Sequence, residues 1–163
     1  CWAGADDVDC TPYAAVFDPF PGTMNSIELI QRADTYVAME IDTTGLTARN
    51  GRWIFETPQG YAVGGQGPKL MTLSRCPGDF DLAAIEAEMG PHCYALVQNL
   101  TPLTWKRAGE RGADCALEPG RTYYLNLFYT VDPEGTAPAD LDWSCSGRET
   151  ESCGNLMVPA WSG

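Results

Sequence analysis

The chain has 163 residues, 44% hydrophobic and 20% charged, a composition typical of one globular domain and not of a disordered chain. Its net charge of −12 argues against nucleic acid and anionic membranes as partners, and no apolar run approaches the ~20 residues that span a bilayer. Seventeen glycines and twelve prolines indicate many turns, which an all-β fold needs.

Residues 1–25 are irregular and rich in Asp and Pro, and they predict an extended arm laid across a domain formed by residues 26–163. Tyr13, Phe17 and Phe20 would anchor this arm. The first residue, Cys1, indicates a processed chain or a fragment. A lipid-bearing cysteine of the bacterial lipoprotein kind is one reading of Cys1, and a local disulfide with Cys10 is the other.

Alternating apolar residues between turn signals predict a series of short strands. They cover residues 26–30, 35–42, 52–57, 69–75, 93–97, 103–106, 121–129 and 156–158. Asn50-Gly51 is the commonest type I′ hairpin signal, so we expect the strand that follows it to return against the strand over 35–42. A short helix is expected over residues 81–89, capped by Asp81 and stopped by Gly90-Pro91.

The run over residues 121–129 is the longest that is rich in aromatic and bulky apolar side chains. Alternation places Tyr123, Leu125 and Leu127 on one face and Asn126 and Phe128 on the other. With apolar residues on both faces, this strand is expected in the middle of a sheet. The whole pattern predicts an all-β chain: an antiparallel β-sandwich, Ig-like or jelly-roll, with at most one short helix and several disulfides.

Seven cysteines without a Cys-x-x-Cys pair, and a single histidine, favour disulfides in an oxidising compartment over a zinc site. Local pairing would join Cys1 to Cys10, Cys76 to Cys93 and Cys145 to Cys153, leaving Cys115 as the odd cysteine. An alternative ties Cys115 to Cys145 or Cys153.

No catalytic constellation is legible. His92 lies in a predicted turn, so a solvent-facing loop histidine is expected, and no nucleophile-elbow motif is present. Glu40 and Glu56 lie on neighbouring strand candidates and could face one another, but no motif makes them a catalytic pair. The glycine-rich stretch over residues 64–67 lacks the spacing of a phosphate loop.

Two kinds of ligand remain compatible with the loops. Calcium prefers hard oxygen ligands, and Asp132, Asp140 and Asp142 form an acidic loop cluster that could supply them. Flat aromatic rings at loop tips stack on sugars, which makes Tyr61, Trp105 and Trp143 the candidate ligand-binding residues. No other cofactor is expected.

The segment Leu73-Ser74-Arg75-Cys76-Pro77-Gly78-Asp79-Phe80, followed by Cys93 and by residues 115–126, resembles a pattern in uncharacterised exported proteins of Gram-negative bacteria. The resemblance covers roughly residues 26–158. It implies secretion and a disulfide-bonded sandwich, and it brings no known activity and no functional residues.

The first functional hypothesis is therefore a secreted, non-catalytic module for extracellular recognition or adhesion, which binds carbohydrate or another cell-surface ligand through loops at one end. The alternative is a structural subunit of an extracellular filament or surface layer, in which copies of the chain assemble through the arm over residues 1–25. A hydrolase is the third hypothesis.

Overall fold

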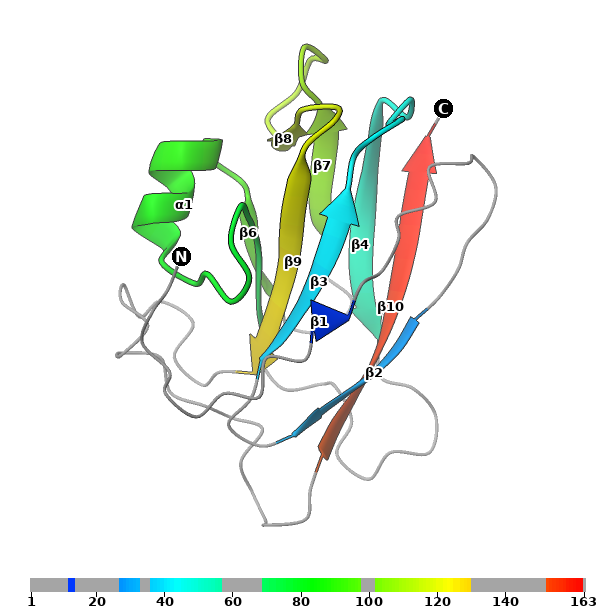
Figure 1. Cartoon of the computed structure of the whole chain (residues 1–163), viewed down its shortest axis with the longest axis vertical. Helices are drawn as coiled ribbons and strands as arrows, with labels where there is room; N and C mark the ends of the chain where they lie inside the picture. Colours follow the sequence, from blue (N-terminus) through cyan, green and yellow to red (C-terminus); the bar gives the residue numbers. More distant parts are fainter. Residues whose placement is uncertain are drawn as a thin grey trace.

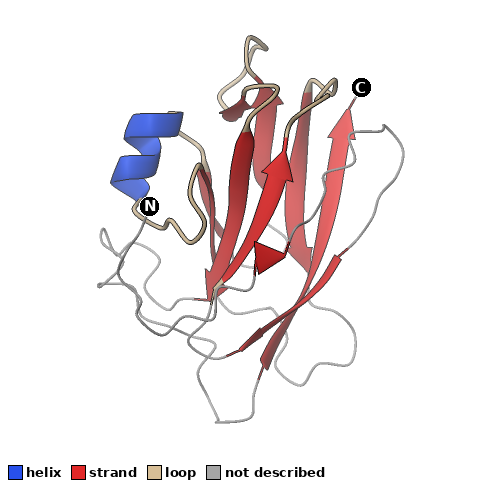
Figure 2. Cartoon of the chain, viewed as in Figure 1, coloured by secondary structure: helices blue, strands red, loops and turns tan. Residues whose placement is uncertain are grey.

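The computed structural model describes residues 12–13, 27–32, 36–56, 69–97, 102–129 and 152–162, with side chains in 36–54, 70–96 and 102–128. These segments form two five-stranded sheets and one short helix (Figures 1 and 2). The predominance of strands confirms the all-β prediction. Among the ladders of these segments, only β1–β3 and β7–β8 are parallel.

The first sheet has the strand order β1-β3-β9-β5-β6. Its members are β1 (Pro12–Tyr13), β3 (Val37–Asp42), β9 (Thr122–Tyr129), β5 (Lys69–Ser74) and β6 (Tyr94–Val97).

The second sheet has the order β2-β10-β4-β7-β8. Its members are β2 (Ile27–Arg32), β10 (Ser152–Ser162), β4 (Asn50–Glu56), β7 (Leu103–Arg107) and β8 (Cys115–Leu117). The predicted strand positions are thus mostly confirmed, although β10 is much longer than the expected strand over residues 156–158.

Strand β9 is the middle strand of the first sheet, as its sequence predicts. Tyr123, Leu125 and Leu127 point into a cluster that also holds Trp53 and Trp105 of the second sheet. Phe128 lies on the other face, in a second cluster with Leu70, Phe80 and Tyr36. The two sheets therefore share one hydrophobic core, and β9 is buried on both faces.

Helix α1 (Leu82–Met89) begins where the sequence predicts it. The Asp81 carboxylate accepts a hydrogen bond from the Ala84 amide at 3.0 Å and so caps the first turn. Gly90, at φ 86°, ends the helix in a conformation that glycine adopts without strain. Ile85 belongs to the core shared by the sheets and Leu82 packs against the second cluster, so α1 contacts both.

The hairpin predicted at Asn50-Gly51 is wrong. Strand β3 pairs with β9 in the first sheet, whereas β4 pairs with β10 and β7 in the second. Asn50 and Gly51 are themselves strand residues of β4. Residues 43–49 instead cross from one sheet to the other, because Thr43 is bonded to the turn before β9 and not to the start of β4. Glu40 and Glu56 consequently lie in different sheets and do not face one another.

The predicted cysteine pattern also needs correction. Cys115 is not the odd cysteine, because it is bonded to Cys93 with a Cα–Cα distance of 4.6 Å. Cys76 takes part in another disulfide, so the predicted Cys76–Cys93 pair is wrong, as are the alternatives for Cys115. Local spacing misleads here because the bond joins the edge of one sheet, at β6, to the edge of the other, at β8. The side chains of Cys1, Cys10, Cys145 and Cys153 lie outside the described residues.

Part of the predicted arm contacts the domain. Pro12 and Tyr13 form β1, which pairs in parallel with Ala38 and Met39 of β3. The other residues of the arm are outside the described segments, so the boundary at residue 25 stays a prediction.

We expect replacement of both Cys93 and Cys115 by alanine to lower the free energy of unfolding by about 3 kcal/mol, the loop-closure contribution of a link with a separation of 22 residues. Denaturant unfolding measures this loss, and peptide mapping of the unreduced wild-type protein should recover a Cys93–Cys115 fragment. Recovery of a Cys76–Cys93 fragment instead would contradict the assignment.

Candidate functional site

One end of the molecule gathers three loops that come from both sheets. We call residues 43–52 and 104–121 the loop end; it holds the β3–β4, β7–β8 and β8–β9 connections, at the top of Figure 1. Strand β10 finishes at this end too, since Ser162 pairs with Asn50. Loops carried at the end of a rigid sheet scaffold are where binding residues concentrate.

Thr43 ties two of these loops together. Its hydroxyl lies 2.7 Å from the Glu118 carbonyl oxygen and 2.8 Å from the Arg121 carbonyl oxygen, to either of which it can donate. The same hydroxyl accepts from the Arg121 amide at 2.8 Å, and the Thr43 carbonyl accepts from the Gly120 amide at 3.0 Å. Thr43 is buried, so these bonds are shielded from competing water.

Arg107 connects the third loop to the first. Its amide donates to the Arg49 carbonyl at 2.8 Å, and its guanidinium donates to the Thr47 carbonyl at 3.1 Å. The same guanidinium forms an ion pair with Glu110 at 2.8 Å. The three loops are therefore one hydrogen-bonded unit.

The loop end is basic although the chain is strongly acidic. It carries six of the ten basic residues and three of the 22 acidic ones, so its formal charge is +3 while the other 135 residues carry −15. Arg121 pairs locally with Glu118 at 3.1 Å, and the Lys106 ammonium donates to the Gly112 carbonyl. Arg49, Arg52 and Arg111 are exposed. Such a surface suits an anionic ligand.

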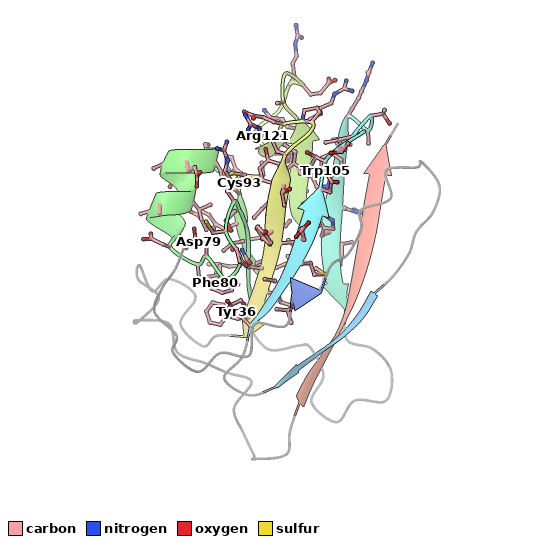
Figure 3. The ribbon with its side chains drawn as sticks, in the orientation of Figure 1. Tyr36, Asp79, Phe80, Cys93, Trp105 and Arg121 are labelled. Carbon is pink, nitrogen blue, oxygen red and sulfur yellow. A yellow bond between two sulfur atoms is a disulfide. The ribbon has the colours of Figure 1, made fainter. Side chains whose placement is uncertain are left out.

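A second concentration of polar groups lies on the outer face of the first sheet, beneath the segment over residues 75–81. The Asn126 side-chain amide donates to Ser74 Oγ at 2.9 Å and to Thr72 Oγ1 at 3.1 Å, and its oxygen accepts from the Gly78 amide at 2.8 Å. Thr72 in turn donates to the Asp79 carbonyl at 2.6 Å. Figure 3 shows Tyr36, Phe80 and Asp79 along this side of the sheet and Arg121 at the loop end.

This buried network positions the segment over residues 75–81. Burial raises the pKa of the Asp79 carboxyl above its ordinary value, and a hydrogen bond from the Asp81 amide opposes the rise. Asp79 thereby holds the residue that caps α1. Every polar group named here has a partner within the protein, so the network acts as a structural clamp and offers no ready binding position.

The structure separates the predicted site residues. Trp105 is not a ligand-binding ring: it is fully buried and packs on Trp53 with 5.8 Å between ring centroids. Alternation along β7 turns Trp105 inward together with Leu103, which its position beside a loop concealed. Tyr61, Trp143, and the calcium candidates Asp132, Asp140 and Asp142 lie outside the described residues. Within the described part of the chain, no group of three His, Cys, Asp or Glu side chains could hold a metal ion.

His92 lies in an exposed turn before β6, with φ 70°, as its sequence context predicts. The basic loop end was missed from the sequence because its arginines and lysine fall in two segments more than 50 residues apart. Uneven distribution of a scarce charge was the signal available, since six of ten basic residues occupy 28 positions.

Comparison with protein-family models, with curated proteins and with solved structures finds no match to this chain. In the part of the chain that the structure describes, no helix is long and apolar enough to cross a bilayer.

Two Pro-Gly turns provide a matched test of the clamp. Gly78 and Gly120 have φ values of 69° and 75°, so an alanine costs roughly 1 kcal/mol of backbone strain at either. At Gly78 the added methyl would also lie 2.3 Å from the Tyr36 ring, whereas nothing lies within 4 Å at Gly120. We expect Gly78→Ala to lower the free energy of unfolding by a further 1–3 kcal/mol or so, as overpacking does. Equal losses in the two variants, measured by denaturant unfolding, would show that the segment over residues 75–81 does not press on Tyr36.

Proposed function

We propose that this chain is a secreted, non-catalytic β-sandwich module that recognises a carbohydrate or another extracellular surface ligand through its loop end. The observation that carries the proposal is the bonding of three loops from two sheets into one unit around Thr43 and Arg107. A surface held in this way loses little conformational entropy when a ligand binds.

The described structure supports the remaining parts of the proposal. A core shared by two sheets is what a sandwich requires. The Cys93–Cys115 disulfide, with the further disulfide of Cys76, is typical of proteins that fold in an oxidising compartment. Guanidinium groups dominate the loop end, and because they keep their protons at neutral pH they bind anions and do not act as acid–base catalysts.

The alternative is a structural subunit of an extracellular filament or surface layer. It draws on one observation: residues 12–13 of the N-terminal arm already add a strand to the edge of the first sheet, beside β3. In an assembly the arm of one copy would add this strand to the next copy. Regular polymers of the native protein, lost when residues 1–25 are removed, would favour this alternative.

We expect the folded, unreduced protein to bind members of a glycan array, and a Thr43→Val variant to bind them more weakly. This change removes the hydroxyl that joins the β3–β4 and β8–β9 loops while keeping the shape of the side chain. Gly120→Ala, which meets nothing within 4 Å, controls for general loss of stability. Binding that is absent from the array, or unaltered by Thr43→Val at equal folded fraction, would count against recognition through the loop end.

A further inference from the structure

We propose that the loop end binds an acidic polysaccharide, through the carboxylate or sulfate groups of its sugars. This inference rests on the proposed recognition function and names the class of its ligand.

The first step is the distribution of charge. A formal charge of +3 on the loop end, against −15 on the rest of the chain, makes this end the one place where an extended anion meets attraction. The acidic remainder repels the same anion, so the field orients the protein with its loop end toward the ligand.

The second step is the state of the basic side chains. Arg49, Arg52 and Arg111 are exposed, and none of them forms an ion pair within the described residues. Planar guanidinium groups bind carboxylate and sulfate-like oxygens with two parallel hydrogen bonds, which makes arginine better suited to such groups than lysine. Five of the six basic residues of the loop end are arginines.

The third step is their mounting. The Arg49 carbonyl accepts the Arg107 amide, and Lys106 donates to the Gly112 carbonyl in the loop that carries Arg111. Arg52 lies on β4 opposite Thr104 of β7. The neighbouring residue of Arg52 is Trp53, which points into the core, so Arg52 projects from the outer face. The guanidinium groups therefore project from backbone positions that are fixed relative to one another.

The fourth step distinguishes a polysaccharide from other acidic partners. Folded protein partners are held by an apolar or aromatic centre within the interface. Among the described residues the exposed large hydrophobic side chain is Leu96, which lies on β6 outside the loop end. A nucleic acid duplex requires a broad basic surface, whereas this chain is acidic beyond 28 residues. A flexible chain of acidic sugars can follow a small basic end without touching the acidic remainder.

The test measures binding of the full-length, unreduced protein to four immobilised probes: heparin, polygalacturonate, neutral dextran and duplex DNA. We expect binding to heparin, polygalacturonate or both, weakening as salt is raised, and little binding to dextran or DNA. Comparison of heparin with polygalacturonate shows whether sulfate or carboxylate is preferred.

Single substitutions locate the site. Arg49→Gln, Arg52→Gln and Arg111→Gln should each weaken binding, by about tenfold where a charge-assisted hydrogen bond of roughly 1.5 kcal/mol is lost. Arg75→Gln is the matched control, because Arg75 is an exposed arginine outside the loop end whose contact with Glu88 is a long 3.6 Å. It changes the net charge by the same amount and should leave binding unchanged.

The contrary outcomes separate the two proposals. Binding to neutral glycans alone would overturn this inference and leave the recognition function standing. No binding to any glycan on the probes or on the array would overturn both. Equal binding of DNA at matched salt, or an equal loss with Arg75→Gln, would overturn an acidic-polysaccharide site at the loop end.

Discussion

Burial of β9 on both of its faces is the constraint on which the rest of the structure depends. Its inner face carries Leu125 and Leu127, which the second sheet must cover. Its outer face carries Asn126, whose buried amide would cost about 1–3 kcal/mol if its hydrogen bonds were unmade. The segment over residues 75–81 satisfies that amide and brings Phe80 over Phe128, with 4.5 Å between ring centroids. A single strand thus requires a sheet on one side and a folded segment on the other.

The same strand connects the core to the loop end. Arg121 is the residue before β9 begins, and its amide and carbonyl are both held by Thr43 at the end of β3. The loops are consequently fixed to the two strands that are most deeply buried in the first sheet. A surface fixed in this way presents arginines in a constant arrangement, which is the physical basis for treating it as a recognition surface and not as a set of independent mobile loops.

Much of the fold could be predicted from local pattern, and much of the site could not. Alternation in residues 121–129 placed β9 at the centre of a sheet, and Asp81 with Gly90 located the helix ends. Pairing between sheets escaped prediction, because Asn50-Gly51 carries a hairpin signal that the contacts of Thr43 override. Cys115 and Trp105 were misjudged for a related reason: each points inward from an edge or loop-flanking position, and the partners that bury it are remote in sequence. The loop end is equally a product of tertiary structure.

Hydrogen exchange at the amides of Gly120 and Arg121 tests the central claim, that the loop end is held rigid by Thr43, most directly. These amides donate to the Thr43 carbonyl and hydroxyl, so they should exchange far more slowly than the amide of Gly109 in the exposed β7–β8 turn. In Thr43→Val the Arg121 amide should lose protection, while the Gly120 amide keeps its carbonyl partner. Exchange of both amides as fast as that of Gly109 in the wild-type protein would contradict the account, because the loops would then move independently.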